Sequence, residues 1–259
     1  MTIEPIIAAR GVTRRFGGLV ALDNIDLDVP AGIVQAIIGP NGSGKTTLLN
    51  ALSGASHADA GSIRLGGHEI FRFKPHRVAR LGLARTFQNI RIFENLNVLE
   101  NVKVAAACNR PTSFFDILTS NTRHRRIESD IDVTAREALD MVGLAHRADD
   151  RATQLPYPQR RLLEIARALA SKPNVLLLDE PAAGMNMTES MTLLDIIAKL
   201  KSRGITILLV EHNVRLVMGI SDRVTVLDFG RKIAEGAPSE VQRNPQVIEA
   251  YLGRRHRHA

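Results

Sequence analysis

A glycine-rich segment near the start of the chain has the residue types and spacing of a phosphate-binding loop. Residues 39–46 match the pattern G-x-x-x-x-G-K-[ST], and they lie between an apolar run at 33–38 and a helical pattern at 46–53. The glycines would let backbone N–H groups converge on phosphate oxygens, and the dipole of the following helix favours an anion. Lys45 is expected to reach the β- and γ-phosphates, and the Thr46 hydroxyl to ligate Mg²⁺.

Two later apolar runs also end in residues that could do chemistry. Residues 175–178 are followed by Asp179 and Glu180, and residues 205–210 by Glu211 and His212. Short apolar strands that alternate with helices indicate a parallel sheet covered on both faces. Because ligands bind beyond the carboxyl ends of such strands, the sequence predicts that these residues and the glycine-rich loop line one crevice.

This shared position suggests a division of roles for phosphoryl transfer, in which catalysis is mostly positioning and electrostatics. Asp179 would hold the metal directly or through water, and Glu180 would polarise the water that attacks the γ-phosphate. A neutral His212 could hydrogen-bond the same phosphate. Taken singly, an Asp-Glu pair is as often a solvated strand end, and a lone histidine is more often structural. The phosphate loop favours the catalytic interpretation of all three.

The elements expected around these residues form one α/β domain with an inserted helical part. An alternating pattern at 21–29 predicts a half-buried strand. Helical spacing at 98–108 and 127–142, around a polar, turn-rich interruption at 110–126, predicts a mostly helical insertion. We therefore expect a single domain over 1–259. It would comprise a core at 1–88 and 166–243, a helical subdomain at 89–165 and a tail at 244–259.

Composition excludes several classes of protein. The chain has 259 residues with 44% apolar and 24% charged residues, which excludes a disordered or fibrous chain. The single cysteine, Cys108, excludes a disulfide framework and fits a reducing compartment. The N-terminus lacks the features of a signal peptide, and no run approaches the roughly 18 apolar residues of a membrane span. These features predict a soluble, cytosolic protein.

The net charge of +7 comes from 34 Lys and Arg residues against 27 Asp and Glu residues. Part of the excess lies in the basic cluster at 123–126 and in the last six residues, 254–259. Such clusters are usually solvated, but they can also contact nucleic acid or an anionic membrane. No aromatic residues interleave with them, so no nucleic-acid partner is expected.

Together these motifs resemble the nucleotide-binding subunits of ATP-binding cassette (ABC) transporters. Residues 39–46 resemble the Walker A motif, 175–180 the Walker B motif with its catalytic glutamate, and 184–186 the D-loop. The resemblance implies a P-loop NTPase fold with an N-terminal antiparallel β part, with ATP and Mg²⁺ as cofactors. It assigns catalysis to Glu180, His212 and Gln88, and the metal to Thr46, Gln88 and Asp179. The ATP-binding residues that it implies are Phe16, which would stack on adenine, Gly39, Pro40, Asn41, Gly42, Ser43, Gly44, Lys45, Thr46 and Thr47.

Among the subfamilies, the chain most resembles the LivG-type subunits of branched-chain amino-acid importers. The similar stretches are 82–93, 179–186 and 244–253. This likeness implies import of branched-chain or other hydrophobic amino acids. The implied partners are a second ABC ATPase, two transmembrane permease subunits and, indirectly, an extracytoplasmic solute-binding protein. The chain would lie peripherally on the cytoplasmic face of the inner membrane.

Three other functions stay open. The subunit could serve another solute, such as urea or an amide, or a lipid exporter. It could instead be a soluble ABC ATPase, although no coiled-coil insertion or second Walker A motif is present. A hydrolytically silent regulator is the third, and the retention of Glu180 and His212 argues against it.

One segment departs from the family pattern. The signature Leu-Ser-Gly-Gly-Gln, which in the family caps the nucleotide of the opposite protomer, is here Leu155, Pro156, Tyr157, Pro158 and Gln159. The prolines remove a hydroxyl and N–H donors, and a hydrogen bond to a charged group is worth about 1.5–3 kcal/mol. Alternatively, Pro158 simply suits the first turn of the next helix. Weakened capping would favour a heterodimer with an ATPase whose signature is intact, although a homodimer is possible.

Overall fold

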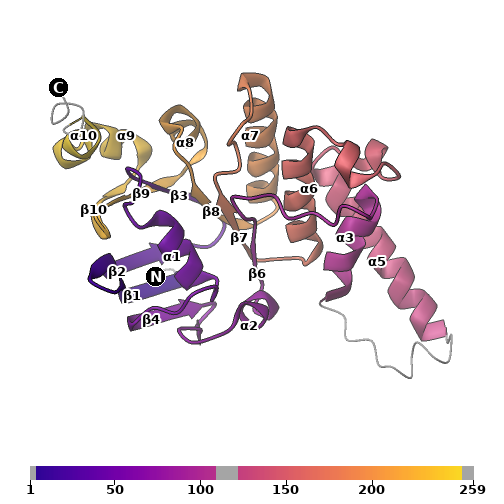
Figure 1. Cartoon of the computed structure of the whole chain (residues 1–259), viewed down its shortest axis with the longest axis horizontal. Coiled ribbons are helices and arrows are strands. Elements are labelled where there is room, and N and C mark those ends of the chain that lie inside the picture. Colours follow the sequence, from indigo (N-terminus) through magenta and orange to yellow (C-terminus); the bar gives the residue numbers. More distant parts are fainter. Residues whose placement is uncertain (1–3, 109–121, 253–259) are drawn as a thin grey trace. The chain divides into compact units, whose positions relative to one another are not determined.

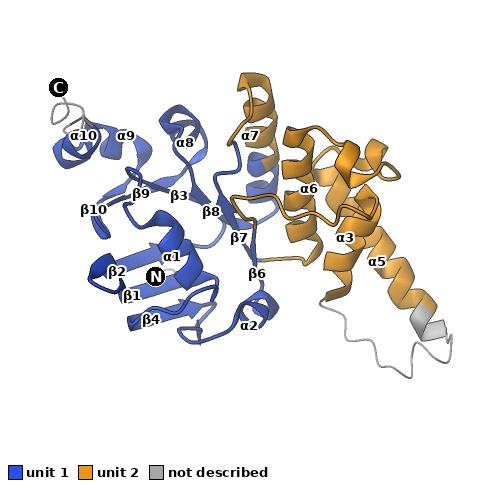
Figure 2. Ribbon diagram, in the orientation of Figure 1, with its two compact units in different colours: residues 1–85, 174–182, 197–259 blue, residues 86–173, 183–196 orange. Residues whose placement is uncertain are grey.

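The computed structural model describes residues 4–108 and 122–252. Two compact units are distinguished in Figure 2. The first unit comprises residues 1–85, 174–182 and 197–259, and the second comprises residues 86–173 and 183–196. The helical subdomain expected at 89–165 lies within residues 86–173 of the second unit, which also includes residues 183–196, after Asp179 and Glu180.

The centre of the first unit is a six-stranded sheet with the strand order β10-β9-β3-β8-β7-β6. All neighbouring pairs are parallel except β9 and β10, which are antiparallel. Its strands are β3 (Val34–Ile38), β6 (Leu83–Arg85), β7 (Val175–Asp179), β8 (Thr206–Val210), β9 (Arg223–Asp228) and β10 (Arg231–Gly236). Every residue of β3, β7 and β8 is buried, which explains why these strands are continuous apolar runs.

Both faces of this sheet are covered, because successive side chains of a strand point to opposite faces. Ile37 of β3 belongs to a cluster with Leu48 of helix α1 (Lys45–Leu52). Ala36 and Ile38 instead join a second cluster with helices α8 (Val214–Ile220), α9 (Pro238–Arg243) and α10 (Pro245–Leu252). Figure 1 shows these helices and α1 in their layers. The expected parallel sheet with helices on both faces is confirmed.

A second sheet, which is antiparallel, contributes buried residues to the hydrophobic cluster that contains Ile37 and Leu48, the larger of the two clusters. It has the order β2-β1-β4-β5. Its strands are β1 (Ile7–Phe16), β2 (Leu19–Val29), β4 (Ala60–Leu65) and β5 (His68–Glu69), and a short helix, α2 (Pro75–Arg80), follows them. Inward-facing residues of β2, such as Ile25 and Leu27, are fully buried and pack in the cluster that contains Leu48. The N-terminal antiparallel part is thereby confirmed.

The second unit is mainly helical. It contains α3 (Val98–Cys108), α5 (Thr122–Met141), α6 (Tyr157–Ala170), the beginning of α7 (Met187–Ser202), and two single turns, η1 (Ala145–Arg147) and η2 (Ala152–Gln154). The predicted helix at 98–108 is confirmed. The second helix begins at Thr122 rather than at 127, because arginine is a good helix former and the basic cluster continues the helix. The rest of the predicted interruption, residues 110–121, lies outside the described residues, as do residues 254–259.

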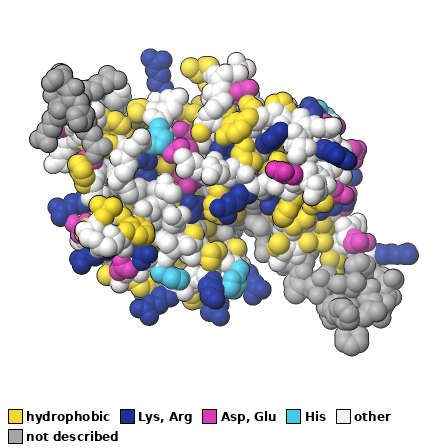
Figure 3. All heavy atoms as spheres, in the orientation of Figure 1, with side chains coloured by type: hydrophobic (Ala, Val, Ile, Leu, Met, Phe, Trp, Pro, Cys, Tyr) yellow, Lys and Arg dark blue, Asp and Glu magenta, His cyan; other side chains and the backbone are white. Residues whose placement is uncertain are grey.

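Part of the chain's excess of Lys and Arg over Asp and Glu lies on the surface of the first unit, in addition to the two basic clusters noted in the sequence. Between residues 64 and 80 the only acid is Glu69, and five exposed cations accompany it. They are Arg64, Arg72, Lys74, Arg77 and Arg80, on β4, α2 and the segment between them. Figure 3 shows how basic side chains are distributed over one face of the molecule. Among the described residues, no helix has the length and apolar character needed to cross a membrane.

The central strands should dominate the stability of the first unit. Leu208 in β8 is fully buried in the larger cluster. Leu208→Ala is expected to lower the free energy of unfolding by about 2–5 kcal/mol, because it removes buried methyl groups and leaves a cavity. Urea denaturation would measure this. Leu19→Ala, at a position that is 66% exposed in β2, is the matched control and should change stability by less than about 0.5 kcal/mol. Equal losses in the two variants would contradict this account of the core.

Candidate nucleotide site

The glycine-rich loop connects β3 to α1, as the sequence predicted, and its backbone requires glycine at both ends. Gly39 and Gly44 have φ angles of 153° and 104°. A Cβ atom at Gly39 would lie 2.1 Å from the carbonyl oxygen of Leu227, and one at Gly44 would lie 2.6 Å from that of Ala21. The loop is therefore packed against β2 and the end of β9, where no larger residue fits. This close packing holds the loop's backbone N–H groups in place.

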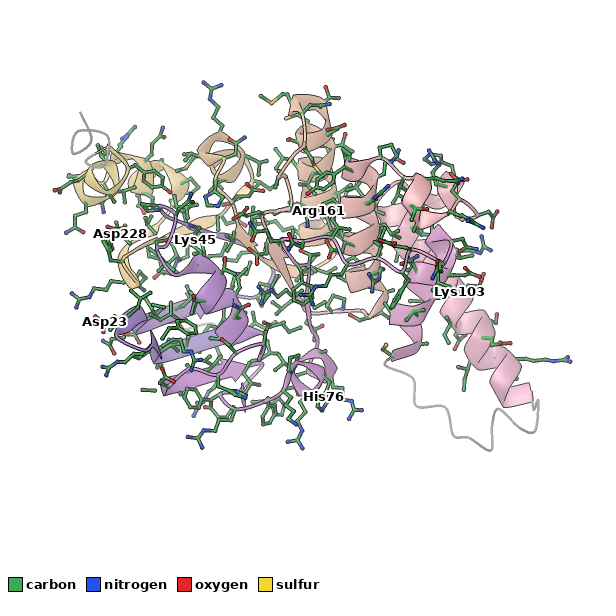
Figure 4. All side chains as sticks on the ribbon, in the orientation of Figure 1. Asp23, Lys45, His76, Lys103, Arg161 and Asp228 are labelled. Carbon is green, nitrogen blue, oxygen red and sulfur yellow. The ribbon has the colours of Figure 1, made fainter. Side chains whose placement is uncertain are left out.

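Side chains of the loop fit an anionic group. The Ser43 side chain is fully buried, and its hydroxyl has no hydrogen-bond partner among the described residues. Buried hydroxyls are normally satisfied, so an acceptor such as a phosphate oxygen would complete this one. Lys45 is 5% exposed, and its Nζ donates to the carbonyl oxygens of Gly39 at 2.9 Å and Pro40 at 3.0 Å (Figure 4). Burial lowers the pKa of Lys45, while the negative charges of Glu180 and Asp179 oppose that shift.

Asp179, at the end of β7, is held by a buried ion pair. Its Oδ2 accepts a hydrogen bond from the Arg85 guanidinium at 2.9 Å, and both side chains are at most 6% exposed. Arg85 ends β6, the neighbouring strand, and also donates to Asn50 at 2.7 Å and Ser53 at 2.9 Å. No motif in the sequence predicts this role for Arg85. The only signal was its place in a strand next to the one that ends in Asp179, and strand order is not visible in the sequence.

The metal that the resemblance implies would need ligands from outside the protein as well. Among the described residues, no group of three or more His, Cys, Asp or Glu side chains could hold a metal ion. Mg²⁺ typically takes one or two carboxylates and completes its octahedral shell with water and substrate phosphates. Asp179 and the Thr46 hydroxyl suit that pattern, since Thr46 follows Lys45 in α1 at the phosphate loop.

Glu180 follows β7 and is hydrogen-bonded to residues at and just after the end of β8. Its N–H donates to the carbonyl oxygen of Val210 at 2.9 Å, and its carboxylate lies 2.6 Å from Nε2 of His212. An ionised carboxylate only accepts hydrogen bonds, so Nε2 carries the proton in this contact. The φ angle of Glu180 is 49°, a left-handed conformation that is uncommon for a residue other than glycine. Such strain is often found at functional sites, and here it accompanies the side chain that faces His212.

Glu211 is a buried carboxylate that sequence analysis noted only as the residue before His212. Its oxygens accept from the N–H groups of Ala182 at 2.8 Å and His212 at 3.1 Å. Burial raises the pKa of Glu211, and these backbone hydrogen bonds oppose the shift. Glu211 therefore ties the loop after β7 to the loop after β8, the two loops that carry Glu180 and His212.

Phe16, the residue expected to stack on adenine, ends β1 on the antiparallel sheet. Its side chain is 50% exposed, and the Arg14 guanidinium lies 4.7 Å from the ring centroid. The exposed part of the ring is available to a planar ligand. Among the other expected ATP-binding residues, Pro40, Asn41 and Gly42 lie on the loop, and Thr46 and Thr47 lie in the first turn of α1.

The remaining predicted site residues belong to the second unit. They are Gln88, the D-loop residues 184–186, and the signature residues Leu155, Pro156, Tyr157, Pro158 and Gln159. Pro156 is the N-cap of α6, so Pro158 lies in the first helical turn. An N–H group in that turn has no partner within the helix, and Pro158 therefore costs α6 no hydrogen bond. In the first unit, by contrast, the structure brings the loop, Asp179, Glu180 and His212 together at the ends of β3, β7 and β8.

Comparison with known proteins agrees with this geometry. A family model described as ABC transporter matches residues 22–183, and one described as Branched-chain amino acid ATP-binding cassette transporter matches residues 231–257. The high-affinity branched-chain amino acid transport ATP-binding protein BraF of Pseudomonas aeruginosa is 44% identical over 96% of this chain and 98% of its own. The corresponding LivG protein of Salmonella typhimurium is 41% identical over the same shares.

Solved structures of similar fold are ATP-binding cassettes. A nucleotide-free cassette from an ABC transporter superposes with a TM-score of 0.83 at 32% identity, covering 95% of this chain and 98% of that one. A cassette in its ADP conformation gives a TM-score of 0.82 at 32% identity, covering 96% and 98%.

The buried pair between Arg85 and Asp179 should couple strongly in stability. Arg85→Met is expected to lower the free energy of unfolding by about 3–5 kcal/mol, because it leaves the Asp179 carboxylate buried without its cation. The double variant Arg85→Met/Asp179→Leu should recover much of that loss in urea denaturation. Arg10→Met is the control, since Arg10 pairs with Asp28 at the surface and should lose less than about 1 kcal/mol. Additive losses in the double variant would show that the pair is not coupled.

Proposed function

The chain belongs to the ABC transporter family, and we propose that it is the ATP-hydrolysing subunit of an importer for branched-chain or related hydrophobic amino acids. It is an ATPase of this family. The observation that carries the catalytic assignment is the convergence of the phosphate loop with Asp179, Glu180 and His212 at three adjacent strand ends. The match of residues 231–257 to the branched-chain family, together with the names of the relatives, supports the solute class.

In the proposed mechanism, backbone N–H groups of residues 39–46 and the Lys45 ammonium bind the phosphates of ATP. Thr46, Asp179 and Gln88 would hold Mg²⁺, which neutralises charge that develops on the phosphates. Glu180 orients and polarises the attacking water. The N–H group at Nε2 of His212 donates a hydrogen bond either to Glu180, as in the contact described above, or to a γ-phosphate oxygen, because both are anionic acceptors. Closure on ATP and reopening after hydrolysis would drive the permease.

The proposed assembly contains two transmembrane permease subunits, a second ABC ATPase and, through the permease, an extracytoplasmic solute-binding protein. The chain would lie peripherally at the cytoplasmic face of the inner membrane. The exposed cations between Arg64 and Arg80 suit a protein that works near an anionic leaflet, where each basic residue contributes about 1 kcal/mol.

Affinity purification from native membranes in mild detergent tests the assembly. We expect mass spectrometry to find two polytopic proteins and a second ABC ATPase.

The purified complex, reconstituted in vesicles with its solute-binding protein, should take up leucine when ATP is supplied. Glu180→Gln should still bind ATP but lose turnover and uptake. Uptake of urea in place of leucine would reject the solute class. Recovery with ribosomes or nucleic acid would reject the transporter function, and turnover retained in Glu180→Gln would reject the role of Glu180.

The prolines of the signature lead to a prediction about pairing. ATPase turnover per site should be at least about tenfold higher with the second ATPase than for this chain alone, since each lost hydrogen bond to the nucleotide is worth about 1.5–3 kcal/mol. A matched variant, Pro156→Ser/Pro158→Gly, restores the missing groups and should raise the turnover of the chain alone. Equal turnover in all three preparations would contradict the heterodimer.

A further inference from the structure

We propose that Arg161 and Glu164 of α6 are positioning residues that lock the segment carrying Gln88 to the helix that begins at the signature. Through this lock, a change at the signature would reach Gln88 within the same chain. The inference rests on the functions proposed above for Gln88 and for residues 155–159. All the contacts that support it lie within the second unit.

The two residues stand on one face of α6 and are buried. Arg161 and Glu164 are three positions apart, so they are neighbours on the helix surface, and their exposed fractions are 0% and 6%. The guanidinium and the carboxylate lie 3.2 Å apart. Burial raises the pKa of Glu164, and the charge of Arg161 opposes that shift. Because buried charges are costly unless they are fully hydrogen-bonded, the remaining polar atoms of this pair need partners.

Most of those partners are supplied by the backbone around Gln88, while Nε of Arg161 has no hydrogen-bond partner among the described residues. Arg161 donates to the carbonyl oxygens of Phe87 at 2.6 Å and of Gln88 itself at 2.7 Å. The Glu164 carboxylate accepts from the N–H of Arg91 at 3.3 Å and from the N–H of Phe87. One turn further along α6, Arg167 contacts the carbonyl oxygen of Arg91 and lies 4.8 Å from the ring centroid of Phe93. The segment 87–91 is thus held to α6 at several backbone groups.

The same guanidinium reaches back to the signature. Arg161 also donates to the Tyr157 hydroxyl at 3.1 Å, and Tyr157 is the first residue of α6. The Tyr157 ring packs against the D-loop, since a Cβ atom at Gly184 would lie 3.1 Å from it. Arg161, labelled in Figure 4, therefore contacts the signature directly and the D-loop through Tyr157, while it also holds the backbone of Gln88.

Arginine is suited to this arrangement in a way that lysine is not. Its planar fork serves four acceptors in fixed directions, which are Phe87, Gln88, Glu164 and Tyr157. A lysine ammonium is a single point with three donors and cannot span both backbone carbonyls and the tyrosine. Arg161→Lys therefore keeps the buried positive charge beside Glu164 but breaks the fork. Tyr157→Phe removes only the hydroxyl from a side chain that is 47% exposed, so it should fold normally.

The test uses the complex of this chain with its second ATPase and permease. Hydrogen exchange of the amides at 87–91 is measured by mass spectrometry for Arg161→Lys and Tyr157→Phe. We expect exchange there to be about three- to tenfold faster in Arg161→Lys, with a smaller increase in Tyr157→Phe. The magnesium concentration for half-maximal ATPase should rise several-fold in Arg161→Lys, because Gln88 is displaced. Affinity for ATP measured without magnesium should be unchanged, since the phosphate loop lies in the other unit.

Arg160→Lys is the matched control. Arg160 is the neighbouring residue of α6, and it donates to the carbonyl oxygens of Leu155 at 2.7 Å and Thr153 at 2.5 Å rather than to the segment 87–91. Exchange at 87–91 that is no faster in Arg161→Lys than in Arg160→Lys would overturn the lock.

A parallel Gln88→Ala variant separates this inference from the function on which it rests. If Gln88→Ala raises the magnesium requirement and Arg161→Lys does not, the positioning role is overturned. If Gln88→Ala leaves the requirement unchanged, the function proposed for Gln88 fails, and exchange at 87–91 alone decides the lock.

Discussion

The level alignment of three parallel strands is the constraint on which the candidate site depends. Val210 of β8 pairs with both Ile37 of β3 and Asp179 of β7, so the three strands finish at the same height. After each of these strands the chain leaves the sheet within two residues of that level. It does so at the phosphate loop after β3, at Glu180 after β7 and at His212 after β8. A shift of β7 by one residue would turn Asp179 to the other face of the sheet, because side chains alternate along a strand. Such a shift would also separate Asp179 from Arg85, its buried ion-pair partner.

Buried guanidinium groups hold the residues on either side of Thr86, where the chain passes from the first unit to the second. Arg85, the last residue of the first unit's segment, is paired with Asp179. Phe87 and Gln88, at the beginning of the second, are bonded to Arg161. In each case a charge that would be expensive to bury alone is satisfied by groups distant in sequence. Each unit thus fixes its own end of this connection with a specific side chain, so that the connection lies between two ordered anchors.

Sequence patterns were sufficient for features that depend on local order. The phosphate loop, the apolar strands and the acids that follow them are each encoded within a few residues, and the fold class followed from their succession. The contacts of Arg85, Glu211 and Arg161 could not be predicted in the same way, because each depends on which segments become neighbours after folding. The left-handed backbone of Glu180, whose N–H is bonded to Val210, likewise does not follow from its residue type. The start of α5 was misplaced because a basic cluster suits a solvated loop and a helix equally well.

The two halves of the proposed reaction make different demands on this chain. Glu180, His212 and the phosphate loop keep every group that hydrolysis at the chain's own nucleotide would use, including a carboxylate already hydrogen-bonded to the histidine. The signature keeps a helix start, but Pro156 and Pro158 stand where the family has serine and the second glycine, so the serine hydroxyl and two N–H donors are lost. Tyr157, between them, accepts a hydrogen bond from Arg161. A tyrosine whose hydroxyl is bonded in this way would contribute to the connection between signature, D-loop and Gln88 rather than to direct capping of a phosphate. In the proposed heterodimer, this segment would transmit the state of the opposite nucleotide more than bind it, and the donors that complete this chain's own site would come from a partner with an unaltered signature.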